Sequence, residues 1–164
     1  HAALEVEELI ALGRRVEREY SAATRLRLVY DHPPAFRGLN PQGPTEVQRR
    51  CGVLNSISVL TSGHYALCGV GYLAPELIFG QVGVDSLEQI WRAHPVLTYL
   101  RDGIPDRLEG VCERCIMKTT CLGNCVAQNY LRNGSFWGPY WFCEAAERAK
   151  LFPASRLKEN SVWD

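Results

Sequence analysis

The sequence predicts an α+β fold, and three patterns along the chain support this prediction. Residues 4–22 carry apolar side chains at helical spacing, with charged residues on the opposite face. Two β-rich runs between residues 53 and 70 flank a Thr-Ser-Gly turn, which is typical of a hairpin. A capping box at residues 85–88 then begins a helical region. A small sheet and several short helices are therefore expected in one chain.

The first element is an amphipathic helix. Within residues 4–22, the side chains of Leu9, Leu12, Val16 and Tyr20 recur at helical spacing, and glutamate and arginine fill the other face. This spacing predicts that these four residues form the buried face.

A strand and a linker follow this helix. Residues 25–31 alternate apolar and polar side chains, which predicts a strand. Residues 38–46 are rich in glycine and proline and indicate a boundary between two units. A helix and a strand cannot bury a core alone, so residues 1–40 are expected to be the last αβ unit of a larger domain. Residues 41–164 are expected to form a second domain.

The second domain is expected to begin with a β-hairpin. Residues 53–60 and 64–70 are β-rich runs, and Thr61-Ser62-Gly63 separates them. A three-residue connection that contains glycine is a common hairpin turn.

Short helices are expected after the hairpin. Asp85-Ser-Leu-Glu88 is a capping box that begins one helix, and Pro95 begins a second. Residues 125–132 are predicted to form a third helix, which ends at Asn133-Gly134. Residues 112–125 are rich in cysteine and interrupted by glycine, so no regular element is expected there.

Composition excludes several classes of protein. The chain has 164 residues, of which 46% are hydrophobic and 22% charged, so it can bury a core. Lysine plus arginine and aspartate plus glutamate number 18 each. This balance argues against a nucleic-acid-binding protein and against a protein of anionic membrane surfaces. No apolar run approaches ~18 residues, and the absence of a signal peptide pattern predicts a cytoplasmic location.

Seven cysteines are the most informative feature of the composition. Because the number is odd, at least one cysteine would remain unpaired even if all the others formed disulfides. Clustered cysteines in a reducing compartment bind metal more often than they pair with each other. The spacings are Cys51-x16-Cys68, with Gly63 five residues before Cys68, then Cys112-x2-Cys115-x5-Cys121-x3-Cys125, and finally Cys143.

Iron–sulfur clusters fit these spacings better than zinc does. Structural zinc sites use two C-x2-C knuckles, or one knuckle with two histidines. Here only Cys112 and Cys115 form such a knuckle, and the four histidines show no paired spacing. Iron–sulfur clusters accept uneven, loop-borne spacings with one remote partner. Structural zinc and buried apolar thiols remain as alternatives.

The complete pattern resembles the seven-cysteine signature of the SPASM domain. This is the C-terminal auxiliary-cluster domain of many radical S-adenosylmethionine (radical SAM) enzymes, including anaerobic sulfatase maturases and thioether-forming peptide maturases. The signature C-x11-G-x4-C, C-x2-C-x5-C-x3-C, C is matched by all seven cysteines. The segments SLEQIW, GVCERC, CLGNC and LFPASR are also typical of the family. The resemblance covers residues 48–156, and residues 4–37 resemble the last helix and strand of the partial (β/α) barrel that precedes such domains.

The resemblance implies two [4Fe–4S] clusters, with the cysteine-rich loops around them. The ligands of the cluster farther from the barrel, here called the distal set, would be Cys112, Cys115, Cys121 and Cys143. The ligands of the nearer cluster, the near set, would be Cys51, Cys68 and Cys125. Cys121 and Cys125 lie across a glycine-containing turn and can point in opposite directions.

The near cluster is expected to have one iron without a protein thiolate. Two such clusters require four thiolates each, and the chain has seven cysteines. In family members whose nearer cluster is fully ligated, an extra cysteine lies shortly after the first one, where this chain has Asn55-Ser56-Ile57-Ser58. By resemblance to the thioether-forming enzymes, the open iron would bind a substrate cysteine thiolate. Alternatively, a serine, a histidine such as His64, or a carboxylate closes the coordination shell.

The resemblance implies that the clusters relay electrons, anchor substrate, or both, in an enzyme that modifies a peptide or protein side chain. Radical SAM catalysis also needs a C-x3-C-x2-C loop. Cys121-x3-Cys125 is the only C-x3-C here, and Gln128 stands where the third cysteine would be. The chain is therefore expected to be a C-terminal fragment that does not cleave S-adenosylmethionine. That cofactor and a third cluster would belong to the full-length enzyme, with the rest of the barrel as partner.

Two other functions are compatible with the cysteine pattern. One is a zinc-stabilised structural or binding module without a redox role. The other is a stand-alone ferredoxin-like electron carrier, which the αβ unit at residues 4–37 disfavours because a free carrier has no need of it.

An aromatic stretch, residues 136–142, precedes Cys143. It is expected to form an apolar lid over the neighbouring cluster, which would exclude water from the sulfur atoms. A peptide-docking surface is the alternative.

Overall fold

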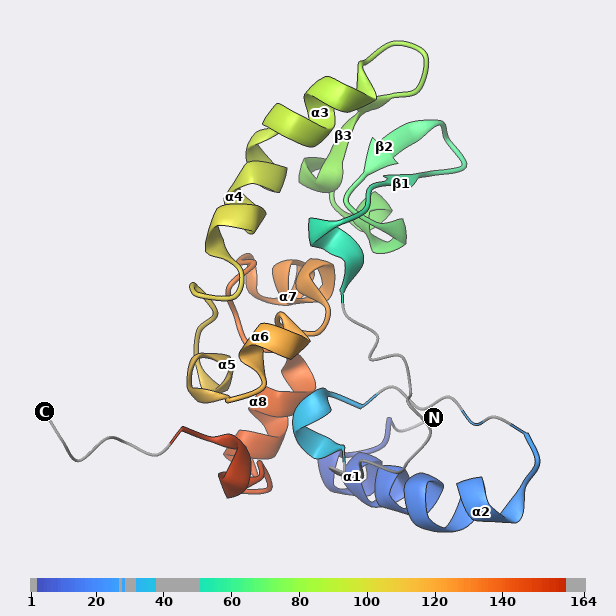
Figure 1. Cartoon of the computed structure of the whole chain (residues 1–164), viewed down its shortest axis with the longest axis vertical. Helices are drawn as coiled ribbons and strands as arrows, with labels where there is room; N and C mark the ends of the chain where they lie inside the picture. The colour runs from blue at the N-terminus through green and yellow to red at the C-terminus, as the bar shows by residue number, and fades with distance from the viewer. Residues whose placement is uncertain (1–2, 27, 29–31, 38–50, 159–164) are drawn as a thin grey trace, which may run out of the picture.

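The computed structural model describes residues 3–26, 28, 32–37 and 51–158, which form an elongated assembly of helices with one small sheet (Figure 1). The helices are α1 (Val6–Arg15), α2 (Ser21–Ala23), α3 (Leu87–Ala93), α4 (Pro95–Gly103), α5 (Val111–Arg114), α6 (Lys118–Cys121), α7 (Val126–Asn133) and α8 (Trp141–Arg148). The strands are β1 (Ser58–Val59), β2 (His64–Ala66) and β3 (Ile78–Gln81). The mixture of helices with an antiparallel sheet agrees with the predicted α+β class. None of the described helices is long and apolar enough to cross a membrane.

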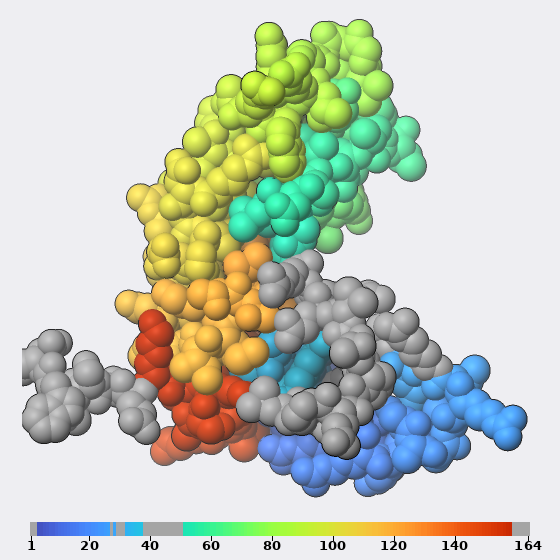
Figure 2. Space-filling model, viewed as in Figure 1, coloured from blue at the N-terminus to red at the C-terminus, as the bar shows by residue number. Residues whose placement is uncertain are grey.

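The sheet, α3 and α4 occupy one end of the molecule, and α1, α2 and α8 the other (Figure 1). Helices α5, α6 and α7 lie between them. In the space-filling view the segment from β1 to α4 projects as one continuous lobe beyond α7 (Figure 2). The cysteine-bearing segments therefore lie where the two ends of the molecule meet.

The predicted hairpin is confirmed, although its strands are shorter than expected. β1 pairs antiparallel with β2, with Ser58 opposite Ala66, and the turn is closed by the Gly63 N–H donating to the Leu60 carbonyl at 2.9 Å. The ends of the two β-rich runs form 3-10 turns instead, at Gly52–Leu54 and Gly69–Leu73.

β3 is a third strand, which the sequence did not predict. It pairs antiparallel with the free edge of β2, in the order β1-β2-β3. Its four residues include Gly80, and so short a run carries no visible alternation.

The predicted helix starts and stops are largely confirmed. α4 begins at Pro95 and α7 ends at Asn133, with Gly134 left-handed at a φ of 67°. The N-cap residue of α3 is Ser86, one residue after Asp85, which is the first residue of the predicted capping box. The Ser86 hydroxyl accepts a hydrogen bond from the Gln89 N–H at 3.4 Å. Asp85 instead accepts from the Gln81 N–H at 2.7 Å and closes the turn after β3.

The absence of regular structure expected for residues 112–125 is wrong. This segment contains most of α5 and all of α6, each four residues long. Helices of one turn show no hydrophobic period, so the sequence could not reveal them.

The N-terminal helix is confirmed, but its buried face is not the expected one. α1 continues through a π-helical stretch, Val16–Tyr20, into α2. Val6 and Ile10 are buried against Phe142 and Ala146 of α8, whereas Tyr20 is 36% exposed. The other three expected residues, Leu9, Leu12 and Val16, are half-buried, and Leu9 packs against the same cluster as Val6 and Ile10. Apolar residues at helical spacing predict an amphipathic helix, but they do not determine which of these residues pack against another helix.

The strand expected at residues 25–31 lies largely outside the described residues, and those described there (25, 26 and 28) are not in a strand. The linker at 38–46 and the boundary between residues 40 and 41 also lie outside them.

The main hydrophobic core joins the sheet to α3, α4 and α7. Its most buried members include Leu67, Leu77, Leu97, Leu100 and Val126. Trp137 closes this core at the end of α4, where its indole N–H donates to the Tyr99 hydroxyl at 2.8 Å. This core holds the segments that carry Cys51, Cys68 and Cys125 in place.

A substitution of Gly103, at the end of α4, tests how tightly this core is packed. A Cβ atom on Gly103 would lie 2.7 Å from Cζ3 of Trp137. We expect Gly103→Ala to lower the free energy of unfolding by about 1–3 kcal/mol, because the buried indole has no room to move. Urea denaturation measures this, with Gly69→Ala as the control, since a Cβ there meets nothing within 4 Å. Equal urea midpoints for the two variants would contradict the expectation.

Candidate functional site

The Cys112–Cys115 knuckle is built on α5 and fastened by the C-terminal segment. Cys112 lies within α5, and Cys115 follows its last residue. Cys115 forms an antiparallel β-bridge with Leu157, and the Ile116 N–H donates to the Arg156 carbonyl at 2.9 Å. The knuckle is thus held by backbone pairing to residues some forty positions later in the chain.

The other two members of the distal set come from α6 and α8. Cys121 is the last residue of α6, and Cys143 lies in the first turn of α8. α8 is tied to α5 by an ion pair between Arg114 and Glu147.

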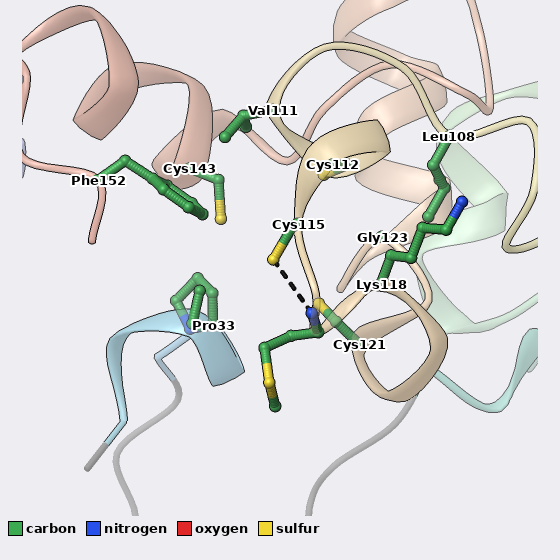
Figure 3. Close-up of a pocket in the computed structure, with 12 residues that line it drawn as sticks. Pro33, Leu108, Val111, Cys112, Cys115, Lys118, Cys121, Gly123, Cys143 and Phe152 are labelled. Carbon is green, nitrogen blue, oxygen red and sulfur yellow. Dashed lines mark hydrogen bonds between the residues drawn. The ribbon is translucent and has the colours of Figure 1, made fainter. Parts of the chain in front are cut away.

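The four thiols of the distal set line one pocket (Figure 3). The remaining wall is mostly apolar and includes Pro33, Leu108, Val111 and Phe152. In Figure 3 the sulfur atoms of Cys115, Cys121 and Cys143 face a common space, with Pro33 and Phe152 on one side of it. Four thiols from three separate segments therefore share one apolar environment.

The four thiols of the distal set also shift one another's pKa values. Burial, together with the charge of Cys112, raises the pKa of Cys121 to about 12. Burial raises the pKa of Cys143 as well, with added repulsion from the other three thiols. Thiols in such an environment stay protonated unless a cation or a metal centre compensates the charge of the thiolates.

Backbone N–H groups point at several of these sulfur atoms. The Met117 N–H donates to Cys115 Sγ at 3.4 Å. Burial raises the pKa of Cys112, and a hydrogen bond from the backbone of Tyr140 to its sulfur partly offsets this rise. Such bonds favour the thiolate. They also stabilise thiolates that ligate iron–sulfur clusters.

A left-handed turn separates Cys121 from Cys125. Leu122, Gly123 and Asn124 have φ values of 54°, 78° and 62°. The buried side chain of Asn129 donates from Nδ2 to the Gly123 carbonyl at 2.9 Å. The turn reverses the chain direction, so that the two cysteines join different neighbourhoods.

The near set gathers at the start of α7. Cys125 is the N-cap residue of α7, and the nearby backbone N–H groups of Gln128 and Ala127 favour its thiolate, although its side chain makes no capping hydrogen bond. Burial raises the pKa of Cys125, and the charges of Cys51 and Cys68 raise it further. Cys51 and Cys68 are half-buried, and both pack against the main core.

Two candidates for a fourth ligand of the near set, Ser56 and His64, have other partners. The Ser56 hydroxyl donates to the Gly52 carbonyl at 2.8 Å. The His64 ring lies 3.0 Å, through Nδ1, from the Ser62 hydroxyl at the tip of the hairpin.

The seven cysteines thus fall into a group of four and a group of three, with the same members as the distal and near sets. Within the described part of the chain, no group of three or more histidine, cysteine or carboxylate side chains has the arrangement needed to hold a metal ion. The assignment of the seven cysteines as cluster ligands stays a prediction.

The aromatic stretch does not form a single lid over the distal set. Phe136 and Trp137 join the main core, and Phe142 packs against His32 and Phe36. Of this stretch, Tyr140 alone packs against the cluster of buried residues that contains Cys112 and Cys143. The expectation of a lid at 136–142 is therefore wrong, and Phe152 and Pro33 border the pocket instead.

Three residues of this region carry no signal in the sequence. Asn129 fixes the turn, Lys118 lines the pocket, and Arg156 acts on Cys115. Their roles depend on burial and on contacts between distant segments, and no spacing in the sequence signals them.

Comparison with family models, with curated proteins and with solved structures finds no match for this chain.

Asn129 provides a test of the turn. We expect Asn129→Ala to lower the free energy of unfolding of the metal-free, reduced chain by about 2 kcal/mol, because it leaves the buried Gly123 carbonyl without its donor and creates a cavity. Gln128→Ala, on the exposed face of the same helix, should change it by less than about 0.5 kcal/mol. Urea denaturation measures both, and an Asn129→Ala value as small as that of the control would refute the role of this side chain.

Proposed function

We propose that this chain is an auxiliary iron–sulfur domain of a radical SAM enzyme that modifies a peptide or protein side chain. The observation that carries the proposal is the division of the seven cysteines. Cys121 and Cys125 are separated by three residues, yet one lies with Cys112, Cys115 and Cys143 and the other with Cys51 and Cys68. Two sites with these members are what the resemblance to the SPASM domain implies.

The distal set supplies four thiols, the number that one [4Fe–4S] cluster needs. A cluster bound there would supply one-electron transfer. The residues of the chain exclude water from the sulfur atoms through Phe152, Leu108 and Val111, and direct backbone N–H groups at the thiolates. Both features tune the potential of such clusters. The donor set fits a cluster better than it fits an isolated structural zinc ion, because its spacings are uneven.

The near set supplies three thiols and leaves one coordination position for an exogenous ligand. The N-terminal end of α7 favours negative charge at Cys125, through the N–H groups of Ala127 and Gln128. By resemblance to thioether-forming enzymes, the exogenous ligand would be the thiolate of a substrate cysteine. The position would hold the substrate sulfur in a fixed orientation.

The remainder of the proposal concerns the larger protein. Residues 4–37 would be the last unit of a partial (β/α) barrel, and residues 41–164 the SPASM domain, with the boundary near residue 40. The barrel would bind S-adenosylmethionine and a third cluster. The reducing environment that such clusters require supports a cytoplasmic location.

Iron analysis of two matched variants tests the division into two clusters. After anaerobic reconstitution, we expect Cys115→Ala and Cys68→Ala each to lose about half of the iron and sulfide, and each to keep the electron paramagnetic resonance (EPR) signal that the other loses. The wild-type chain is the reference. Zinc without sulfide would support the zinc-stabilised module instead, and loss of all iron in either variant would contradict two independent sites.

The open coordination position of the near set has its own test. Addition of a cysteine-containing peptide to the reduced, reconstituted chain should change the EPR signal that Cys115→Ala retains, and leave the other signal unchanged. The same peptide with serine in place of cysteine is the control. An unchanged signal at saturating peptide would mean that a side chain of the protein closes this position.

A further inference from the structure

Residues 32–37, here called the 32–37 segment, close one side of the pocket that the distal set lines. Pro33 and Ala35 line this pocket, and both are buried. In Figure 3 Pro33 lies across the common space from the sulfur atoms of Cys115 and Cys143. The side chains of proline and alanine carry no atom that ligates a metal. This wall therefore encloses the thiols without supplying a ligand from these two side chains.

Ring contacts hold the 32–37 segment against α8 and the chain that follows it. The Phe36 ring lies edge-on to the rings of Phe142 and Phe152, with centroids 5.0 and 5.5 Å apart. The His32 ring packs on the Phe142 ring, with centroids 4.7 Å apart. Phe142 directly precedes Cys143, so these contacts join the segment to the wall that carries a thiol of the distal set.

The backbone of the 32–37 segment contributes less to this attachment than its rings do. The N–H groups of Phe36 and Arg37 donate within the segment, to the carbonyls of Pro33 and Pro34 at 2.9 and 3.3 Å. The two prolines have no N–H to donate. Four of the six residues therefore offer no backbone N–H to the rest of the chain. A side chain supplies a further contact, because Arg156 donates from NH2 to the Arg37 carbonyl at 3.2 Å.

The wall that carries the Cys112–Cys115 knuckle is held differently, by backbone pairing between distant segments. The Ile116 N–H donates to the Arg156 carbonyl at 2.9 Å, and the Lys158 N–H donates to the Arg114 carbonyl at 2.8 Å. These two bonds flank Cys115 on both sides. Local opening takes place where the least structure has to be broken. Of the two walls, the 32–37 segment is therefore the one that can open while the fold stays intact.

A metal centre has to reach thiols that are buried in the closed pocket. Cys112, Cys115 and Cys143 are 8%, 7% and 5% exposed. A metal site needs an entry path as well as ligands. Movement of the cysteine-bearing wall would separate the ligands from one another, whereas movement of the 32–37 segment leaves all four of them in place.

We propose that the 32–37 segment is a movable wall of the distal pocket, which opens to admit a metal centre to the four thiols and then closes over it. The nature of this centre rests on the proposed function, whereas the opening is a property of the metal-free chain as well. In the open state Phe36 leaves Phe142 and Phe152, and Pro33 and Ala35 no longer cover the thiols. In the closed state the segment excludes water and retains the bound centre.

Thiol labelling of the reduced, metal-free chain measures the opening. N-ethylmaleimide modifies the thiols, and mass spectrometry follows each cysteine separately. We expect Phe36→Ala to speed the labelling of Cys112, Cys115 and Cys143 about tenfold, because two ring contacts that hold the wall closed are lost. The labelling rates of the near set should not change. Comparison of the same cysteine in the two chains cancels its intrinsic reactivity.

Phe136→Ala is the matched control. It removes the same side chain from the main core, where the Phe136 ring stacks on Tyr130 with centroids 4.5 Å apart. It should leave the labelling of the distal set unchanged. Equal acceleration by the two variants would mean that global unfolding exposes the distal thiols, and would overturn the proposal. Unchanged distal labelling in Phe36→Ala would overturn it as well.

A milder pair of variants decides the question if Phe36→Ala does not fold. Arg156→Met removes the donor to the Arg37 carbonyl and should speed distal labelling about threefold, as expected for the loss of one hydrogen bond. Arg148→Gln removes an arginine whose side chain is 70% exposed and pairs with Glu144, and should have no effect. Equal labelling rates in these two variants would contradict a movable wall.

Iron release tests whether the closed wall retains the bound centre. The distal iron of the reconstituted chain is the fraction that Cys115→Ala lacks. A chelator should remove it about tenfold faster from Phe36→Ala than from the wild-type chain, and should remove the near iron at the same rate from both. Equal release of the distal iron would overturn its retention by this wall. A wild-type chain that takes up no iron would refute the proposed function, and the labelling rates would still decide whether the wall opens.

Discussion

The left-handed turn at Leu122, Gly123 and Asn124 is the constraint on which both groups of cysteines depend. A left-handed leucine costs about 1–2 kcal/mol, and Leu122 partly offsets this cost by packing against the main core. The hydrogen bond from the buried Asn129 to Gly123 then holds the turn in one conformation. Without the reversal, Cys121 and Cys125 would follow each other along one helix and share one neighbourhood. The turn is therefore the physical reason why Cys121 and Cys125 lie in two different neighbourhoods.

Distant segments of the chain complete the distal set. α1 packs on α8, which carries Cys143, and the segment after Pro153 pairs with the knuckle at Cys115. Pro33, from the N-terminal part, borders the same pocket (Figure 3). The pocket thus requires residues 3–37 and 151–158 as well as the cysteine-rich segment between them. The near set depends instead on the main core beneath the sheet, so the two sets rest on different parts of the structure.

Three features could be predicted from the sequence: the hairpin, the start of α4 at Pro95 and the end of α7 before Gly134. Each of these features is determined by a few adjacent residues. β3, α5 and α6 were missed because they are shorter than any period that could reveal them. The buried face of α1 was wrong because its partner, α8, lies more than a hundred residues away. For the candidate site, the spacing singled out the seven cysteines, and their grouping as ligands of two clusters came from the family resemblance and stays a prediction. Arg156 and Asn129 could not be found, because their importance comes from burial and not from their type or spacing.

The two groups of cysteines also differ in how the chain balances their charge. At Cys125 the compensation comes from N–H groups at the start of α7, which are neutral dipoles whose effect falls off within one turn. At the distal set, N–H groups act on Cys112, Cys115 and Cys121, and Arg156 also favours the thiolate at Cys115. At each of these cysteines burial is the largest effect and raises the pKa of the thiol. The thiols therefore stay protonated unless a bound cation or metal centre compensates the charge of the thiolates.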